Sequence, residues 1–331
     1  MADALYGQSG FYRRERPAAH FRTSVHASPL FAAALASLVG RVDAALGRPE
    51  RLDLVDVGAG TGELLTGILA AVPGELRDRL RPVGVEVAER PAGLPAGIGW
   101  SGAIPELAGL LVANEWLDNV PADVVELTAA GPRLVLVDDA GEESLGPPVG
   151  GGDRGWLDRW WPLTEIGARA EVGLARDAAW AGAVGRVRRG VAVAIDYAHT
   201  RADRAAGAIR GGTLAAYRDG RPVRPVPDGS CDLTAHVALD ACAATATAGQ
   251  SPGRVTGTVL TSQRAALRAL GLHGRRPPGA LAGSDPAAYL VALARAGQAA
   301  ELTDPAGLGG FTWLVQAVGV PLPVSLPPEQ P

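Results

Sequence analysis

A glycine-rich loop follows a short apolar run. The run Leu52–Val57 predicts a buried strand, and the segment Asp56-Val57-Gly58-Ala59-Gly60-Thr61-Gly62 carries glycine at every second position. Glycines at this spacing let the backbone turn tightly and approach a ligand, and the helix predicted over Glu63–Val72 offers its N-terminus nearby. A dinucleotide fingerprint would need its third glycine at position 63, which is Glu63. An acidic side chain beside the loop suits a cationic ligand better than a pyrophosphate, so we predict a ligand without phosphate. Its contacts are predicted to come from Asp56, Gly58, Gly60 and Gly62.

Polar or aromatic side chains also follow the next predicted strands. The strand Pro82–Val87 carries Glu86, 24 positions after the last loop glycine, where a carboxylate can accept hydrogen bonds from both hydroxyls of a ribose. The strand Leu110–Asn114 ends in Asn114, which could bind the amino-acid part of a cofactor or simply form a turn. A loop at Trp100 could lie against an adenine. Together with the glycine loop, these features resemble a class I S-adenosylmethionine (SAM) methyltransferase, whose cofactor has a ribose, an adenine and a sulfonium but no phosphate.

Two carboxylates follow the strand that ends at Asn114. Glu115 and Asp118 are three positions apart and would share a face if this segment turned into a helix. Methyl transfer is an in-line displacement in which the enzyme positions the two reactants and removes a proton when the nucleophile requires it. A guanidinium acceptor would need carboxylates to hold its planar fork. We therefore predict Glu115 and Asp118 as catalytic residues, with surface or capping carboxylates as the alternative.

A third catalytic candidate, His236, lies four positions after Asp232, which could place both on one face of a helix. His236 could be a general base, or it could be a core histidine bonded to Asp232. Asp196 stands near the end of the apolar strand Val191–Tyr197, and a buried carboxylate after such a run needs a partner.

Composition limits the chemistry further. The chain has 331 residues with 31 basic and 35 acidic side chains, a net charge of -4, and every basic residue is arginine. The absence of lysine excludes a lysine Schiff base, a P-loop NTPase of the usual kind and a protein kinase. The acidic balance argues against nucleic-acid binding. The sequence contains no run of about 18 apolar residues, so it predicts no membrane span. Cys231 and Cys242 match no metal motif and fit a reducing compartment. We expect no metal, a cytoplasmic location and a monomer or homodimer.

Strand-like and helix-like segments alternate along the chain. This predicts an α/β fold with a mainly parallel sheet, helices on both faces, and N-terminal, mid-chain and C-terminal additions. Ser28 as N-cap and Pro29 at the first helical position predict a helix through Val39. Further strands are predicted at Val124–Thr128 and Arg133–Val137, as a hairpin around Gly131-Pro132, and at Val255–Leu260 and Thr312–Val318. Helices are predicted at Ala170–Val187, Ser262–Leu270 and Pro286–Ala299, a loop at Gly141–Gly155 and a frayed tail at Pro321–Pro331.

The organisation predicted from these elements has four parts. Residues 1–48 form a helical segment that contributes to the site, and residues 49–200 form the SAM-binding core. Residues 201–320 form an accessory substrate region with the last strands of the sheet, and residues 321–331 form a tail.

Two longer motifs narrow the family. Asn114-Glu115-Trp116-Leu117-Asp118-Asn119-Val120-Pro121 resembles the NE-x-x-DA-x-P signature of the MidA-type methyltransferases, which include the mitochondrial complex I assembly methyltransferase. Asp232-Leu233-Thr234-Ala235-His236-Val237 is similar to the DLTAHVD block of the same family. Shorter similarities occur at Tyr12, Phe21, Thr23, Pro29, Phe31, Glu171, Trp180, Asp196-Tyr197, Gly212-Thr213-Leu214 and Gln263. The resemblance spans roughly residues 6–318 and implies a class I fold, SAM as cofactor and a protein arginine side chain as acceptor.

The substrate side departs from this family more than the cofactor side. His20 replaces the aspartate of a DF motif, and Ser24 follows Thr23 where the family continues as TAPE with an acidic residue. Ala198 replaces the glycine of DYG, and Gly220 stands where a histidine is usual. Three hypotheses therefore stay open. The chain is a SAM-dependent methyltransferase that modifies a protein side chain, a weak or inactive relative that acts as an assembly or scaffolding factor, or a small-molecule methyltransferase.

Overall fold

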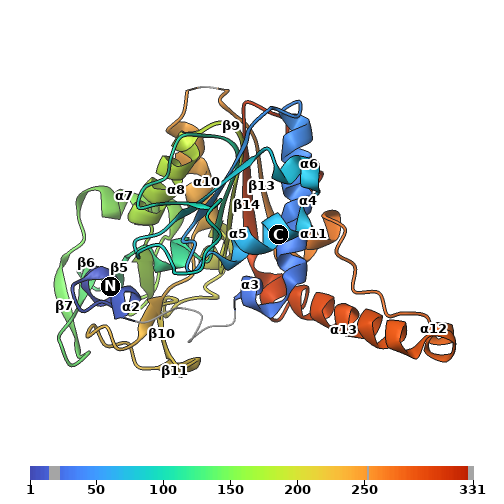
Figure 1. Ribbon diagram of the computed structural model, residues 1–331. Helices are drawn as coiled ribbons and strands as arrows, with labels where there is room; N and C mark the ends of the chain where they lie inside the picture. Colours follow the sequence, from blue (N-terminus) through green and yellow to red (C-terminus); the bar gives the residue numbers. More distant parts are fainter. Residues whose placement is uncertain (15–22, 252, 327–331) are drawn as a thin grey trace.

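The computed structural model describes residues 1–14, 23–251 and 253–326 (Figure 1). A seven-stranded sheet lies at the centre, in the order β13-β14-β9-β4-β1-β2-β3. Five neighbouring strands are parallel: β1 (Leu52–Val57), β2 (Leu80–Val85), β3 (Gly99–Ser101), β4 (Leu107–Asn114) and β9 (Val187–Asp196). At one edge, β14 (Thr312–Val318) and β13 (Val255–Ser262) are added with antiparallel pairing. The predicted mainly parallel α/β sheet is confirmed.

The strand order reverses beside β1. From β1 the chain proceeds outward through β2 to β3, and then returns to place β4 on the other side of β1. In open α/β sheets this reversal leaves a crevice at the carboxyl ends of the strands, where ligands bind. Asp56 near the end of β1 and Asn114 at the end of β4 therefore flank this crevice.

Helices cover both faces of the sheet, as predicted, because alternate strand residues face opposite sides. Leu110 and Val112 of β4 pack into one hydrophobic core, whereas Leu111 and Ala113 pack into another. The first core is covered by α4 (Pro29–Ala45), α5 (Glu63–Ala71), α6 (Gly74–Arg77), α11 (Gln263–Ala269), η3 (Leu308–Gly310) and the end of α13 (Pro286–Leu302). The second is covered by α8 (Leu174–Arg186) and α10 (Leu239–Ala248).

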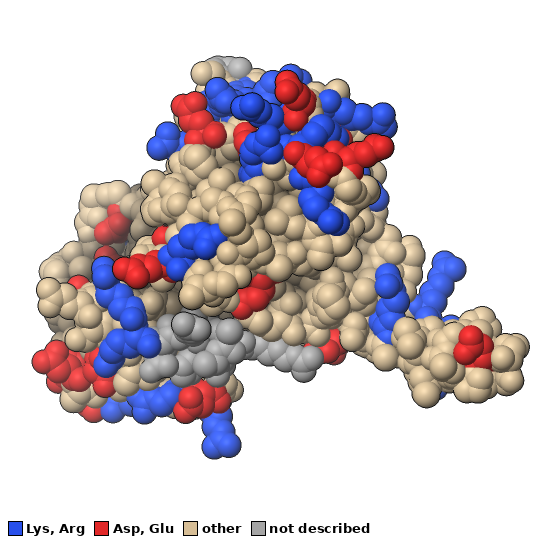
Figure 2. Space-filling view, viewed as in Figure 1, with Lys and Arg blue, Asp and Glu red and all other residues tan. Residues whose placement is uncertain are grey.

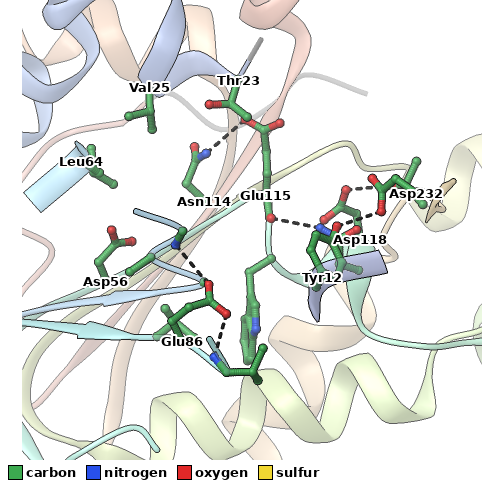
Figure 3. Close-up of a pocket in the computed structure, with 18 of the residues that line it drawn as sticks. Tyr12, Thr23, Val25, Asp56, Leu64, Glu86, Asn114, Glu115, Asp118 and Asp232 are labelled. Atoms are coloured by element: carbon green, nitrogen blue, oxygen red, sulfur yellow. Dashed lines mark hydrogen bonds between the residues drawn. The ribbon is translucent and has the colours of Figure 1, made fainter. Parts of the chain in front are cut away.

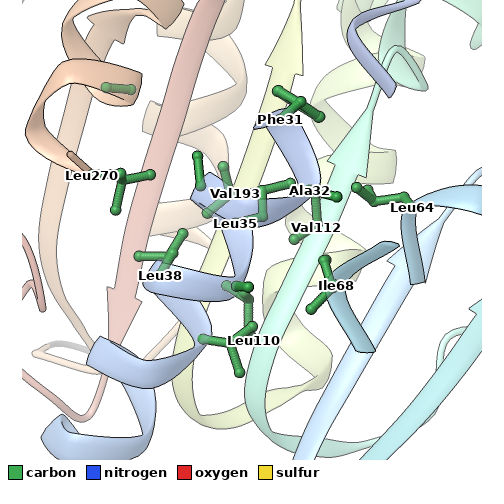
Figure 4. Packing of buried hydrophobic residues seen from close by; sticks show 14 of the residues in the cluster. Phe31, Ala32, Leu35, Leu38, Leu64, Ile68, Leu110, Val112, Val193 and Leu270 are labelled. Atoms are coloured by element: carbon green, nitrogen blue, oxygen red, sulfur yellow. The ribbon is translucent and has the colours of Figure 1, made fainter. Parts of the chain in front are cut away.

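The helix α4 shows how local sequence and packing agree. Ser28 caps it, with its hydroxyl accepting a hydrogen bond from the backbone N–H of Leu30 at 3.1 Å, and proline occupies the first turn. Phe31, Leu35 and Leu38 of this helix lie against β4 and its neighbours (Figure 4). Burying each such side chain stabilises the fold by about 1.5–3 kcal/mol. The predicted helix at this position is confirmed and extends beyond its predicted end.

Two small sheets are inserted into this framework. The antiparallel sheet β7-β6-β5-β8 lies between β4 and β9 in the chain, and the sheet β11-β10-β12 lies between β9 and β13. The first sheet consists of β5 (Asp123–Thr128), β6 (Gly131–Val137), β7 (Glu143–Pro148) and β8 (Arg169–Val172), with α7 (Gly151–Trp160) beside it. The second consists of β10 (Ala215–Arg218), β11 (Arg221–Val223) and β12 (Asp232–Thr234), and it follows α9 (Arg201–Ala205).

The N-terminal helices pack against the second small sheet. In α1 (Ala2–Tyr6) and α2 (Phe11–Arg14), Leu5 and Phe11 are buried together with Ala216 and Leu233 of that sheet. The short α3 (Ser24–Ala27) then leads into α4. His20 and Phe21, which were singled out above, lie outside the described residues. In this way the start of the chain lies beside segments that follow more than 200 positions later.

A helical arm projects from the other side of the molecule. It consists of α12 (Gly279–Ser284) and most of α13, and it extends away from the sheet (Figure 1). Figure 2 shows arginine and acidic side chains interspersed over one face of the molecule. Among the described residues, no helix is long and apolar enough to cross a membrane, and no group of three or more His, Cys, Asp or Glu side chains could hold a metal ion.

The strand β2 lies two residues earlier than the predicted Pro82–Val87, so Glu86 follows it directly. Four further local predictions are wrong or shifted. The predicted loop Gly141–Gly155 contains β7 and the start of α7, because the segment pairs with β6 at the sheet edge, where proline is tolerated. The predicted helix Ala170–Val187 begins as β8, which pairs with β5, and becomes helical only at Leu174. The hairpin of β5 and β6 exists, but it turns before Gly131, which pairs with Thr128. The predicted tail is not frayed over its first part, since Val324 and Leu326 are buried in the first core, while residues 327–331 lie outside the described residues.

Candidate active site

A cavity of about 1050 Å³ opens at the carboxyl ends of the central strands. Residues of α1–α3, the glycine loop, the ends of β2 and β4, and the second small sheet line it. The described lining residues include two histidines, His26 and His236, and no arginine. They also include seven acidic residues: Asp56, Glu63, Glu86, Glu115, Asp118, Asp219 and Asp232. The cavity is therefore rich in hydrogen-bond acceptors and poor in cations.

The glycine loop forms one wall of the cavity. Gly58, Gly60 and Gly62 have φ values of +74°, +56° and +84°, in the left-handed region that favours glycine. Gly58 and Gly60 line the cavity, and a Cβ at Gly60 would face open space. Gly62 does not line it; a Cβ there would collide with the side chain of Leu94, so this glycine serves close packing before α5. At Gly60, therefore, no side chain separates the backbone of the loop from the cavity.

Glu86 connects the end of β2 to this loop. One carboxylate oxygen accepts a hydrogen bond from the backbone N–H of Gly60 at 3.1 Å, and the other accepts one from the N–H of Val87 at 2.7 Å. Figure 3 shows Glu86 and Asp56 on one side of the cavity and Asp118 and Asp232 on the other. Glu86 therefore lies where a ligand at the glycine loop would meet it.

Asp56 lies beneath the loop and is only 4 % exposed. Burial, with the nearby charges of Glu86 and Glu63, raises the pKa of its carboxyl from 3.8 to about 8. An unliganded Asp56 consequently keeps its proton at neutral pH, and a cation placed beside it would favour the charged form.

Trp100 does not line the cavity, contrary to the prediction. It lies in β3, where its indole packs against Gly84 and its Nε1–H donates to the carbonyl of Ala88 at 3.0 Å. The residues that line the cavity here come just after β3: Gly102, Ala103 and Ile104. A tryptophan in a short strand fills the space left by a glycine on the neighbouring strand, which a sequence scan does not show.

Asn114 and Glu115 stand at the centre of the cavity (Figure 3). The side-chain N–H of Asn114 donates to Glu115 Oε1 at 3.1 Å, and Asn114 Oδ1 is buried without a hydrogen-bond partner. Glu115 has φ +51°, a conformation that costs a non-glycine residue about 1–3 kcal/mol and is concentrated at functional sites. Burial, and next the charge of Asp118, raises the pKa of the Glu115 carboxyl from 4.5 to about 8. This carboxyl can therefore exchange a proton near neutral pH.

Asp118 lies across the cavity from Asp56. It belongs to the 3-10 helix η2 (Leu117–Asn119), so it does not share an α-helical face with Glu115 as predicted, although both line the cavity. Its Oδ2 accepts a hydrogen bond from the hydroxyl of Thr234 at 2.8 Å. Its Oδ1 is buried without a partner, and the residue is 5 % exposed. One oxygen of this carboxylate is thus left without a hydrogen bond in the cavity wall.

Asp196 has the partners that its position at the end of β9 requires. Its Oδ2 accepts hydrogen bonds from the backbone N–H groups of Leu117 at 3.0 Å and Asp118 at 3.2 Å. Its Oδ1 accepts one from the N–H of Tyr197 at 3.0 Å. Burial and the nearby charges of Asp118 and Glu115 raise the pKa of Asp196 well above its ordinary value.

A buried guanidinium, that of Arg176 on α8, joins two loops of the site. It donates to the carbonyl oxygens of Asp118 at 2.8 Å, Val120 at 3.0 Å, Ala235 at 3.0 Å and His236 at 2.8 Å. Burial lowers the pKa of this arginine, and the charge of Asp118 opposes that shift. Arg176 thereby fixes η2 and the segment after β12 relative to each other.

His236 follows β12 in an irregular segment, so the predicted shared helix face with Asp232 does not exist. It is exposed within the cavity, which excludes a core histidine. Its ring stacks on Tyr197 with centroids 5.6 Å apart, and its backbone N–H donates to the hydroxyl of Thr213 at 3.0 Å. Although water reaches the ring, desolvation by the cavity walls lowers the pKa of His236, and so a neutral imidazole is favoured.

The tyrosines of the N-terminal helices form a wall that sequence reasoning missed in part. The hydroxyl of Tyr12, which only the family resemblance indicated, donates to Asp232 Oδ1 at 2.9 Å. Tyr6 stacks on Tyr12 with ring centroids 5.6 Å apart, and its hydroxyl donates to the carbonyl of Asn119 at 3.1 Å. Tyr6 is separated by 113 positions from Asn119, whose carbonyl its hydroxyl contacts, and no local pattern indicated it.

His26 was also missed, and Glu63 was noted only as the residue that breaks the dinucleotide fingerprint, not as part of the site. His26 Nδ1 lies 2.8 Å from the hydroxyl oxygen of Thr23, and His26 Nε2 lies 3.7 Å from Glu63 Oε1. All three residues line the glycine-loop end of the cavity. His26 and Glu63 lie on different helices, far apart in the sequence, so no spacing motif links them.

Comparison with known proteins places this site in a family. Residues 34–255 match the model of a family described as "Putative S-adenosyl-L-methionine-dependent methyltransferase". A crystal structure of a Burkholderia thailandensis protein bound to S-adenosyl-homocysteine is similar, with a TM-score of 0.78 and 26% identity over 97% of this chain and 87% of that chain. A second crystal structure from the same organism, of a protein assigned to the same superfamily as the first, is also similar. It has a TM-score of 0.77 and 27% identity over 97% of this chain and 86% of that chain.

No curated protein matches the chain significantly. The matched family model covers well over half of the chain, and the similar structures cover almost all of it. The chain therefore belongs to this family of S-adenosyl-L-methionine-dependent methyltransferases, and S-adenosyl-L-methionine is its cofactor.

Proposed function

We propose that SAM binds at the glycine-loop end of the cavity and that the acceptor is a guanidinium group, that of an arginine side chain in a protein. Three features of the described residues fit the cofactor. The bare backbone at Gly60 permits close approach, Glu86 offers a carboxylate for the ribose hydroxyls, and the buried, unpartnered Asn114 Oδ1 can accept a hydrogen bond from the ammonium.

The unsatisfied Oδ1 of Asp118 is the observation that carries the acceptor assignment. A buried carboxylate oxygen without a donor costs free energy, and a ligand rich in N–H groups would remove that cost. Asp232 adds negative charge to the same wall, and a bound cation would lower the raised pKa of the Glu115 carboxyl and favour its charged form. The rings of Tyr6 and Tyr12 also line this wall and are of the type that contacts cations. A planar guanidinium suits this set, because it presents five donors and a positive charge.

The residues of the resemblance gather in one place, which supports a MidA-type assignment. Asn114, Glu115 and Asp118 of the first motif and Asp232 and His236 of the second all line the cavity. The N-terminal segment also contributes Tyr6, Tyr12 and Thr23, in keeping with the expected role of residues 1–48.

In this assignment the protein mainly orients the acceptor. SAM supplies a methyl group on a positively charged sulfur. Asp118 and Glu115 hold the guanidinium so that one nitrogen faces that methyl carbon. As the nitrogen–carbon bond forms, the carbon–sulfur bond breaks and its electron pair stays on sulfur. The nitrogen then loses a proton, for which Glu115, with its raised pKa, or the neutral imidazole of His236 is the acceptor.

The test uses radiolabelled SAM, the purified full chain and a cell lysate. The expected result is label in protein that appears as methylarginine after acid hydrolysis. An Asp118→Asn variant should still bind S-adenosylhomocysteine but transfer at least tenfold less label, because the acceptor loses a charge-assisted hydrogen bond. Label confined to small molecules would support a biosynthetic methyltransferase, and cofactor binding without any transfer would support an assembly or scaffolding factor.

A further inference from the structure

The amino-acid part of SAM has two groups of opposite charge, and each needs a partner in the cavity. It carries an ammonium, which the acceptor-rich cavity can satisfy, and a carboxylate, which needs a donor or a cation. The chain has no lysine, and the described lining residues include seven acidic side chains but no arginine. Among these residues, His26 and His236 have the side chains whose ring N–H can donate a hydrogen bond to a carboxylate and that can carry a positive charge. One of them is the candidate partner of the carboxylate.

The two histidines occupy different ends of the cavity. His236 lies beside Tyr197 and Thr213, on the side of the second small sheet that we assign to the acceptor. His26 lies on α3, and its Nε2 is 3.7 Å from Glu63, the first residue of α5 and the residue directly after the glycine loop. Of the two histidines, His26 is therefore the candidate partner for a cofactor bound at the glycine loop.

The surroundings of His26 suit a carboxylate. The hydroxyl of Thr23 contacts Nδ1 at 2.8 Å and fixes the ring, which leaves Nε2 directed toward Glu63. A carboxylate oxygen of Glu63 lies 3.7 Å from Nε2, beyond hydrogen-bond distance, so a ligand carboxylate that bound Nε2 would take the place of Glu63 there. The side chain of His26 remains 30% exposed, so a ligand can reach it. The N-terminus of the nine-residue helix α5, whose dipole favours negative charge, lies on the same side.

We propose that His26 binds the carboxylate of the SAM amino-acid part, with Thr23 orienting the imidazole, while Asn114 receives the ammonium. This inference rests on the proposed position of the cofactor at the glycine loop. It gives the methionine end of SAM one orientation, with its carboxylate toward α3 and α5 and its ammonium toward the end of β4.

The test compares two ligands by calorimetry. S-adenosylhomocysteine has the amino-acid part, and 5′-methylthioadenosine lacks it. His26→Ala should raise the Kd of S-adenosylhomocysteine about tenfold or more, because a charge-assisted hydrogen bond is lost, and should leave the Kd of 5′-methylthioadenosine unchanged. His26→Glu should weaken S-adenosylhomocysteine further through repulsion. The exposed His273, which does not line the cavity, supplies the control variant His273→Ala, which should bind both ligands as the unaltered chain does.

The outcomes separate this inference from the proposed function. If the unaltered chain fails to bind either ligand, the proposed position of the cofactor is wrong. If it binds both and His26→Ala weakens both equally, or weakens neither, the carboxylate does not lie on His26. If His26→Glu binds S-adenosylhomocysteine as tightly as the unaltered chain, position 26 faces the ammonium and the orientation is reversed. Thermal unfolding of each variant identifies a loss of folding.

Discussion

The carboxylate of Asp196 accepts a hydrogen bond from the backbone N–H of Asp118 at 3.2 Å. Asp196 ends β9 and Asp118 lies in the turn after β4, so the bond joins the carboxyl ends of two neighbouring parallel strands. A second bond to Leu117, at 3.0 Å, fixes the same turn. The apolar strand β9 thus sets the position of the carboxylate that we assign to the acceptor.

Replacing Asp196 by asparagine should disturb this turn. Both oxygens of Asp196 accept backbone N–H donors, and an amide group cannot accept on its nitrogen side, so at least one donor loses its partner. The free energy of unfolding should fall by about 1–3 kcal/mol, as measured by urea denaturation. Methyl transfer should fall more than S-adenosylhomocysteine affinity, since Asp118 shifts while the glycine loop does not. The exposed Asp158→Asn is the control, and equal transfer rates in the two variants would contradict a positioning role.

Arg176→Met should cost more stability. The buried guanidinium satisfies four backbone carbonyl oxygens and faces Asp118, Asp196 and Glu171, so its removal leaves acceptors unpaired and carboxylates without a counter-charge. We expect the free energy of unfolding to fall by about 3 kcal/mol or more. Arg186→Met changes an exposed arginine on the same helix and should stay within about 0.5 kcal/mol of the unaltered chain. Similar losses in both variants would show that Arg176 contributes only packing of its stem.

Gly60→Val tests the bare backbone of the glycine loop. The left-handed φ of +56° should cost roughly 1–2 kcal/mol for a residue with a Cβ, and the new side chain would occupy the open space at the cavity wall. Binding of S-adenosylhomocysteine should be lost. Gly271→Val introduces a similar backbone strain at φ +94°, also with open space around the Cβ, but away from the cavity. It should lose a similar amount of stability and keep its affinity, and a loss of affinity in both variants would point to a general effect of strain.

The stability of the unliganded protein should depend on pH through Asp56 and Glu115. Their pKa values rise from 3.8 and 4.5 to about 8 on folding, so the folded state holds protons that the unfolded state releases. Their contribution to stability is complete below about pH 4 and is lost as the pH rises through 8. Each group contributes a slope of at most about 1.4 kcal/mol per pH unit within this window.

Urea denaturation between pH 5 and pH 8 measures this contribution. Asp56→Asn and Glu115→Gln should each flatten the curve relative to the unaltered chain, because an amide releases no proton. Glu75→Gln, at an exposed position, should leave its slope as it is. A variant curve parallel to that of the unaltered chain would show that the corresponding carboxyl is charged in the folded state.

The cofactor side of the site follows from local sequence to a large extent. The run Leu52–Val57, the glycine loop and the helix from Glu63 were predicted at nearly their observed bounds, because strand, tight turn and helix each have a local pattern. Trp100 was misplaced because its neighbour Gly84 lies on another strand. The predictions of a loop at Gly141–Gly155 and of a helix at Ala170–Val187 were wrong for a related reason. In both segments, pairing with a partner strand overrides a weak local preference.

The sequence by itself determined the fold class, the glycine loop and the acidic residues at the ends of its strands. Only the tertiary structure decided which other side chains these acidic residues contact. Tyr12 and Asp232 are separated by 220 positions, and Thr234 and Asp118 by 116, yet each pair is joined by a hydrogen bond. The first contact forms because α1 and α2 bury Leu5 and Phe11 against the second small sheet. The second forms where Arg176 joins the carbonyls of Asp118 and Ala235. Periodicity encodes which side of an element is buried, but burial against a distant partner decides which side chains meet.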